Sequence, residues 1–181
     1  MNEVIKTILA RRGTKEYRAD PVDKGTMELL MKCAAAAPNA FNAQKWHFTC
    51  ITNRALLDEL EEKCYQALVK CGECSADSVY YPFYKAPAVL VFSASVENQF
   101  GRQDCSAALE NAALAAKSLG LGSRFLDVPN EYFHSEAAAE TRKLCGIPDG
   151  YETICFLSVG YPADPAEQPT AKRDDIFTYL D

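Results

Sequence analysis

The sequence predicts one domain of the three-layer α/β class, in which a sheet lies between two layers of helices. Helix-like and strand-like hydrophobic patterns alternate along the chain and give about four strands and five helices. No internal repeat or linker divides the 181 residues, so residues 1–181 are expected to form a single domain. Hydrophobic residues make up 48% and charged residues 24%, which is typical of a globular protein.

Five segments have the helical pattern, with apolar residues three and four positions apart. They begin at Asn2, Asp23 or Thr26, Asn53, Asp104 and Ser135. The first is expected to run to Arg11 or Arg12, the second to end at Pro38, and the last two to run to Leu119 and Leu144. The third carries apolar residues as far as Leu68. The segment Asp104–Leu119 carries only three charged residues and many alanines. Small side chains all around a helix indicate close packing on more than one side, so this helix is expected at the centre of the domain or at a subunit interface.

Four segments have the strand pattern. Residues 46–52 alternate, with Trp46, Phe48 and Cys50 on one side, and residues 88–93 are continuously apolar, which predicts a strand buried on both faces. A short strand over residues 123–128 and a strong strand over residues 152–160 follow. The tyrosine-rich stretch from Gly72 to Pro87 is expected to be a long loop, and loops of that length are often functional.

Composition and charge exclude several classes of protein. The net charge of −6 disfavours a general nucleic-acid binder. No apolar run approaches the roughly 20 residues that a membrane span needs. The first twelve residues are too few and too charged for a signal peptide, so the eight cysteines are expected as reduced thiols in the cytoplasm.

Only Cys71 and Cys74 have the spacing of a metal or redox pair. A zinc site would need a second pair or histidines nearby, and His47 and His134 are both distant in sequence. The pair is either functional or, as we favour, the end of a helix followed by a loop, and no metal site is predicted. His47 lies on the alternating strand and is expected to be structural.

Signatures of familiar catalytic and nucleotide sites are missing. The stretch "LGLGSRF" follows a helix rather than a strand and has Phe125 where a dinucleotide fingerprint needs its third glycine. The sequence has no P-loop, no G-x-S-x-G and no H-E-x-x-H. No catalytic side chain is therefore predicted, and a bound cofactor is expected to carry the chemistry.

Two polar clusters remain as candidate binding residues. Arg11, Arg12, Lys15 and Arg18 fall within eight positions of an acidic chain. The two arginines could simply complement a helix dipole, but the other two cations lie beyond the helix, and such a cluster beside a glycine indicates a site for an anion such as phosphate. Arg18 is expected to be solvated.

The second cluster is an amide-rich loop with Asn39, Asn42 and Gln44. Side-chain amides both donate and accept hydrogen bonds, so they suit the edge of a heterocycle. They equally suit turns in which the amides bond the local backbone.

Taken together, three motifs resemble those of the nitroreductase-like flavoprotein family, in the same order and over nearly the whole chain. The first is "ILARRGTKEYRADPV" and the second is "CAAAAPNAFNAQKWHFTCI". The third is "AALAAKSLGLGSRFL" followed by "GIPDGYETICFLSVGYP" and a closing "AKR". The resemblance implies an α+β fold with a mainly antiparallel central sheet flanked by helices, in an intertwined homodimer that binds FMN at its interface.

The resemblance also implies the cofactor-binding residues, which fall in four groups. The phosphate and ribityl end would be held by Arg11, Arg12 and Gly13, and the ring edge at N1 and C2=O would be approached by Lys15. The amide loop would supply Asn42 and Gln44, with Pro38, Asn39 and Ala40 coming from the facing subunit. The backbone that reaches flavin N5 would be Leu126, Asp127 and Val128, and a closing basic pair on the phosphate would be Lys172 and Arg173.

The implied activity is transfer of hydride from NADH or NADPH through the flavin to a nitroaromatic, quinone or activated alkene. Tyr80, Tyr81, Tyr84 and Phe41 are candidates for lining the acceptor pocket. The alternatives are reductive dehalogenation, flavin cleavage, or an FMN-binding redox protein with little turnover. The last follows from Asp127 and Val128, which stand where many relatives have small residues and would impair access to N5. A carboxylate near the ring would also disfavour the anionic reduced flavin. Gly13, where the family usually has serine, removes one hydroxyl contact.

Overall fold

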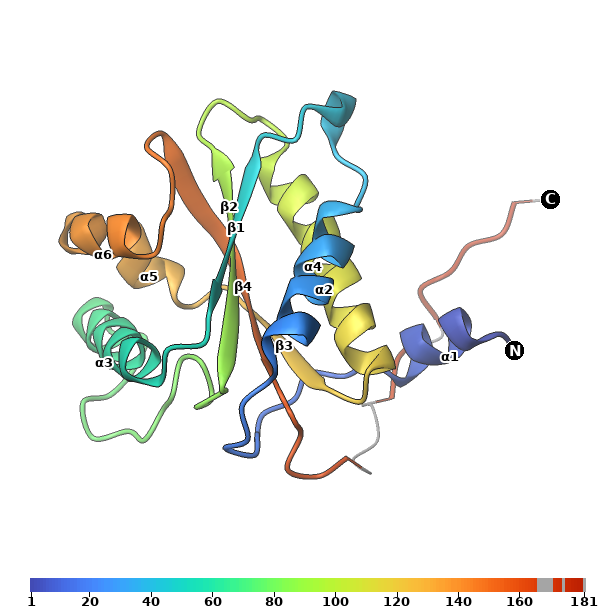
Figure 1. The fold of residues 1–181 in the computed structure, drawn as a ribbon, viewed down its shortest axis with the longest axis horizontal. Helices are drawn as coiled ribbons and strands as arrows, with labels where there is room; N and C mark the ends of the chain where they lie inside the picture. Colours follow the sequence, from blue (N-terminus) through green and yellow to red (C-terminus); the bar gives the residue numbers. More distant parts are fainter. Residues whose placement is uncertain (166–170, 174, 181) are drawn as a thin grey trace.

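The computed structural model describes residues 1–165, 171–173 and 175–180. Its centre is a four-stranded sheet in the order β1-β2-β4-β3, in which every neighbouring pair is antiparallel (Figure 1). The strands are β1 (Trp46–Ile51), β2 (Ala88–Ser95), β3 (Gly122–Leu126) and β4 (Tyr151–Gly160). The expectation of an antiparallel central sheet is confirmed.

Helices cover both faces of the sheet, so the three-layer prediction is also confirmed. The helices are α1 (Glu3–Ala10), α2 (Lys24–Ala35), α3 (Arg54–Cys71), α4 (Gly101–Ser118), α5 (Asn130–Phe133) and α6 (Ala139–Leu144), with short 3₁₀ turns at Ala40–Asn42 and Glu136–Ala138. Helices α2 and α4 lie on one side, and α3, α5 and α6 lie on the other (Figure 1). Within the described ranges, no helix combines the length and the apolar character that crossing a bilayer requires.

Strand β2 is buried on both faces, as its apolar sequence predicted. Leu90 and Phe92 pack into the core beneath α2 and α4, while Val89 and Val91 pack into the core beneath α3 and α5. Full burial of each such side chain contributes about 1.5–3 kcal/mol to folding. On α4 the small side chains, with Ala112 among them, are buried against the sheet and α2, so this helix is central to the domain.

Several element boundaries differ from those expected. Helix α4 begins at Gly101 rather than Asp104, because the carboxylate of Asp104 binds loop groups and does not cap the helix. Ser135 stands at the N-cap position of the 3₁₀ turn Glu136–Ala138, which leads directly into α6 at Ala139, but its hydroxyl donates to the carbonyl of Tyr132 and makes no capping bond. Strand β3 ends at Leu126, and residues 127 and 128 therefore lie in a turn.

The segment after α1 runs along the outer edge of β3. Gly13 forms a bridge with Ser123, and the backbone N–H of Thr14 donates to the Ser123 carbonyl at 2.9 Å. A Cβ on Gly122 would stand 2.5 Å from Oγ1 of Thr14, so only glycine permits this close approach. The N-terminal segment thereby covers an otherwise open sheet edge and brings its basic residues against β3.

Candidate functional site

A small cavity lies where the basic segment meets β3. Its volume is about 110 Å³, and it is lined by Arg11, Arg12, Thr14, Lys117, Gly120, Leu121, Gly122, Ser123, Pro162 and Pro165. Lys117 belongs to the last turn of α4. The sequence analysis missed this third cation, although its position just before "LGLG" was visible in the sequence.

Both predicted arginines line this cavity and also bind other groups of the chain. Nε of Arg11 binds a carboxylate oxygen of Glu110 at 2.9 Å, and Nη2 of Arg12 donates to the Asp164 carbonyl at 2.7 Å. The Glu110 contact uses only Nε, so the fork of Arg11 keeps terminal donors for a ligand. Together with Lys117, the two arginines bring three cations to the lining of this cavity, which suits an anion.

Gly13 and Lys15 follow on the same extended segment, and both are exposed. The side chain of Lys15 makes no hydrogen bond or ion pair with the described residues. Arg18, expected to be solvated, binds Asp20 at 2.7 Å and is exposed.

Beside Gly13 stands Arg124 of β3, which the sequence analysis did not single out. A Cβ on Gly13 would lie 3.1 Å from Nη1 of Arg124, so the guanidinium occupies space that a side chain at position 13 would need. The centre of the guanidinium lies 4.6 Å from the centre of the Tyr84 ring. The sequence did contain a signal for Arg124. It is a charged residue in a short predicted strand, and its charge must lie against the segment that covers that strand.

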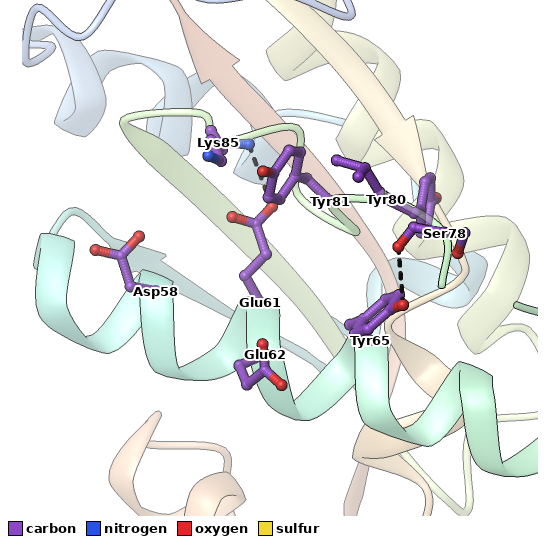
Figure 2. A pocket seen from close by; sticks show the side chains of 9 residues that line it. Asp58, Glu61, Glu62, Tyr65, Ser78, Tyr80, Tyr81 and Lys85 are labelled. Atoms are coloured by element: carbon purple, nitrogen blue, oxygen red, sulfur yellow. Dashed lines mark hydrogen bonds between the residues drawn. The ribbon is translucent and has the colours of Figure 1, made fainter. Parts of the chain in front are cut away.

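The predicted loop between Gly72 and Pro87 carries the candidate tyrosines. Tyr80 and Tyr84 meet edge to face with ring centres 6.1 Å apart, and Tyr84 stacks on Arg124. Tyr81 lies under Nζ of Lys85, 3.9 Å from its ring centre. Tyr80 and Tyr81 both line a separate cavity of about 390 Å³ (Figure 2). Of the three tyrosines, Tyr84 therefore contacts Arg124, and Tyr80 lies between Tyr84 and that cavity.

A buried carboxylate on α3 holds this loop in place. One oxygen of Glu61 accepts the backbone N–H groups of Phe83 at 3.0 Å and Lys85 at 3.2 Å (Figure 2 shows the Lys85 bond). Burial raises the pKa of the Glu61 carboxyl, and the two N–H groups partly oppose that shift. Between these bonds, Tyr84 adopts a left-handed φ of 57°, which costs a non-glycine residue conformational energy.

The amide-rich loop is held in a similar way at the N-terminal end of α4. The backbone N–H of Ala40 donates to Asp104 at 2.9 Å, and the side-chain oxygen of Asn39 accepts the backbone N–H of Gln44 at 2.9 Å. The side chains of Asn42 and Gln44 are 3.5 Å apart and exposed. Asn39 therefore follows the local-backbone alternative, while Asn42 and Gln44 keep their amides at the surface.

The amide loop and the basic cavity lie at opposite ends of α4. Ala40 is bound at Asp104 in the first turn, whereas Lys117 lines the cavity from the last turn. At about 1.5 Å of rise per residue these two positions are about 20 Å apart. One copy of the chain therefore does not bring Pro38, Asn39, Ala40, Asn42 and Gln44 together with Arg11 and Arg12. Phe41 is likewise remote from the tyrosines and packs its edge on Phe100.

The segment expected to approach flavin N5 is a tight turn after β3. Leu126 is buried, and Asp127 and Val128 are exposed. The carboxylate of Asp127 accepts a hydrogen bond from Nδ2 of Asn130 at 2.9 Å. The same amide donates to the Ile154 carbonyl at 2.9 Å, so the turn is tied to β4.

The closing basic pair does not line the cavity within one chain. Lys172 and Arg173 are exposed, and the guanidinium of Arg173 makes two bonds of 2.8 Å to Asp175. Their predicted contact with phosphate stays a prediction.

Cys71 and Cys74 behave as a helix end. Sγ of Cys71 donates to the Leu68 carbonyl at 3.3 Å, and the backbone N–H of Cys74 binds the same carbonyl at 3.2 Å. In the part of the chain that the structure describes, no three His, Cys, Asp or Glu side chains are grouped to hold a metal ion.

Comparison with known proteins agrees with this architecture. A protein of Archaeoglobus fulgidus, whose name proposes NADH dehydrogenase or NAD(P)H nitroreductase activity, is 31% identical over 186 aligned positions, with 98% of this chain and 94% of that protein covered. An FMN reductase [NAD(P)H] of Bacillus subtilis is 25% identical, with 99% and 76% covered. A crystal structure of a Bacteroides fragilis nitroreductase with bound FMN has a TM-score of 0.93 at 26% identity over 100% of both chains.

The family match extends over residues 8–161, which is most of the chain and includes the basic segment, the amide loop and all four strands. The resemblance read from the three sequence motifs is thereby confirmed, together with the fold that it implied. This chain belongs to the nitroreductase family.

Proposed function

We propose that this chain is an FMN-dependent oxidoreductase that uses NAD(P)H to reduce a small oxidised acceptor. The observation that carries the proposal is the phosphate-sized cavity between Arg11, Arg12 and Lys117 in a chain of this family. When bound, FMN would supply the redox chemistry, the transfer of a hydride from NAD(P)H to the acceptor, and solvent would supply the proton.

The residues present fit the cofactor. The cavity volume of about 110 Å³ equals roughly four water molecules, which is enough for a phosphate group but not for a flavin ring. Guanidinium forks match phosphate oxygens. Gly13 directly follows Arg12 and is exposed. The phosphate is therefore assigned to the cavity and the ring to the side of Gly13 and Lys15.

The chain's own residues then have distinct tasks. Arg11, Arg12 and Lys117 hold the phosphate, and Lys15 supplies a positive charge that stabilises the negative charge of the reduced cofactor. Lys172 and Arg173 provide a second basic pair for the phosphate. The proton needs no dedicated side chain, because the basic segment is open to solvent.

The proposed acceptors are nitroaromatics, quinones and activated alkenes. Reductive dehalogenation and flavin cleavage remain alternatives on the same cofactor. The alternative of little turnover, in which Asp127 and Val128 impair access to N5, also remains. The carboxylate of Asp127 is directed to Asn130.

We further propose that the working unit is a homodimer in which the amide loop of one copy completes the site of the other. The separation of about 20 Å along α4 prevents one copy from using both clusters on one small cofactor. Helix α1 also has no buried residue, and its apolar side chains are exposed: Val4 by 66%, Ile5 by 45%, Ile8 by 49% and Leu9 by 61%. Such a face is expected to be covered by a second copy.

The cofactor proposal is tested by the visible absorption of the purified protein and by FMN titration. We expect a yellow protein that releases FMN on denaturation and bleaches with NADH or NADPH. Lys117→Ala removes one charge-assisted contact and is expected to weaken FMN binding about tenfold or more, with riboflavin binding little changed. Lys70→Ala, in the last turn of α3, is the matched control. A chain that neither retains nor takes up FMN contradicts the proposal.

The dimer is tested by sedimentation velocity at micromolar concentration. We expect a dimer for the unchanged chain and a monomer for Leu9→Lys, because the new charge lies on the apolar face of α1. Glu3→Lys, in the first turn of the same helix, serves as the control. A monomeric unchanged chain that still binds FMN contradicts the shared site.

A further inference from the structure

The guanidinium of Arg124 has no polar partner in the described part of the chain. Its side chain makes no hydrogen bond or ion pair there, and Nε is enclosed without an acceptor. Its neighbours are the ring of Tyr84 and the hydroxyl of Tyr17. Burial raises the pKa of Tyr17, so its phenol stays neutral and does not balance the charge. Enclosing a donor and a charge without a partner costs free energy, which a bound acceptor would recover.

Two independent contacts fix where this guanidinium lies. On one side it stands against Gly13, where a Cβ would be 3.1 Å from Nη1. On the other side it stacks on Tyr84, whose left-handed backbone lies between the two N–H groups that Glu61 binds. Figure 2 shows Glu61 directed from α3 toward this loop. A long, otherwise flexible side chain is thus held at the point where the basic segment passes β3.

The phosphate cavity does not account for Arg124. That cavity is lined by other cations and not by Arg124. Gly13 pairs with Ser123 in parallel register, so Arg124 follows Ser123 along β3 in the direction in which the extended segment continues toward Lys15. A ligand whose phosphate fills the cavity would therefore meet Arg124 with a different part. Planar guanidinium donors match carbonyl oxygens and ring nitrogens that carry negative charge.

We propose that Arg124 is a further cofactor-contacting residue, which donates to the polar edge of the flavin ring and, with Lys15, favours its negatively charged reduced form. This inference rests on the proposed FMN site. Gly13 contributes to this arrangement, because the absence of a side chain at position 13 leaves room for the guanidinium of Arg124. The serine hydroxyl usual at this position is thereby replaced by a positive charge from the neighbouring strand.

The test is the two-electron reduction potential of bound FMN, measured by equilibration with reference dyes. In Arg124→Met the reduced form is expected to bind about tenfold more weakly relative to the oxidised form, which lowers the potential by about 30 mV. Arg124→Lys should restore part of the shift. Arg102→Met, an exposed arginine on α4, should leave the potential unchanged. FMN and riboflavin should lose affinity alike, because the contact is to the ring.

Several results would overturn the inference. An unchanged potential in Arg124→Met would do so, as would a loss confined to FMN, which would assign Arg124 to the phosphate. The thermal midpoint of the cofactor-free Met variant should not fall, since the lost guanidinium has no polar partner there. Gly13→Ala, which displaces the guanidinium without removing it, should lower the potential in the same direction. Failure of the unchanged chain to bind FMN would instead contradict the proposed function.

Discussion

Two loops of this molecule, residues 39–44 and residues 80–85, are held by the same type of hydrogen bond to a carboxylate, but they direct their aromatic side chains differently. In each, a helix carboxylate that is only 6% exposed accepts backbone N–H groups of a loop with left-handed non-glycine residues. Asp104 holds the first loop and Glu61 holds the second. The first loop leaves Phe41 91% exposed, whereas the second turns Tyr84 onto Arg124 of the same chain.

A rigid loop backbone therefore does not by itself determine which site the side chains of the loop can reach. The loop held by Glu61 packs Tyr84 on Arg124 of its own chain. The loop held by Asp104 lies about 20 Å along α4 from the basic cavity and directs an aromatic side chain to solvent, as the proposed contact with a second copy would require. Three predictions test this comparison.

The largest effect is expected for Glu61→Ala. The substitution leaves the backbone N–H groups of Phe83 and Lys85 without an acceptor, and we expect it to lower the free energy of unfolding by about 2–4 kcal/mol. Urea unfolding of the cofactor-free protein measures the loss. Tyr84 should also leave Arg124, so FMN affinity should fall.

Two further variants control this prediction. Glu62→Ala, at the exposed neighbouring position of α3, is expected to change stability by less than about 0.5 kcal/mol. Asp104→Ala frees only one backbone N–H and should cost about 1–3 kcal/mol. If Glu61→Ala were as mild as Glu62→Ala, the loop would be held by something other than this carboxylate.

A smaller effect is expected in the pH dependence of stability. Burial raises the pKa of Glu61 in the folded state above the ordinary 4.5. Between 4.5 and the raised value the folded chain binds more protons than the unfolded chain, so the Glu61 contribution to the free energy of unfolding falls as pH rises. That contribution is complete below pH 4.5 and is lost as pH passes the folded pKa.

Glu61→Gln keeps an oxygen acceptor but cannot ionise. Its stability, measured by urea unfolding from pH 4 to pH 8, should lack this decline, which reaches at most about 1.4 kcal/mol per pH unit. Parallel pH profiles for the variant and the unchanged chain would mean that Glu61 does not titrate in this range.

The smallest effect on stability is expected for Phe41→Ala. A side chain that is 91% exposed contributes little to the fold of one copy, so the cofactor-free chain at low concentration should change by less than about 0.5 kcal/mol. Dimer dissociation, followed by sedimentation at decreasing concentration, should nevertheless occur more readily. A clear loss of stability together with unchanged dimerisation would place Phe41 in the core of its own chain.

The sequence alone determined the local features of this protein. Asp23 and Asn53 cap their helices because capping bonds join residues only three positions apart, and both caps are present. The burial of β2 followed from its continuous apolar run. The basic cluster and the order of the motifs indicated the family and the expected cofactor-binding residues, and the family is confirmed.

Contacts between residues far apart in the chain become visible only in the tertiary structure. Three such contacts join distant positions: Glu61 with the 80–85 loop, Arg124 with Gly13, and Arg11 with Glu110. No local sequence pattern predicts them. The placing of the amide loop and the basic cavity at opposite ends of α4 is of the same kind. This separation follows from how the helices pack on the sheet. It places the candidate residues on two separate surfaces of one chain.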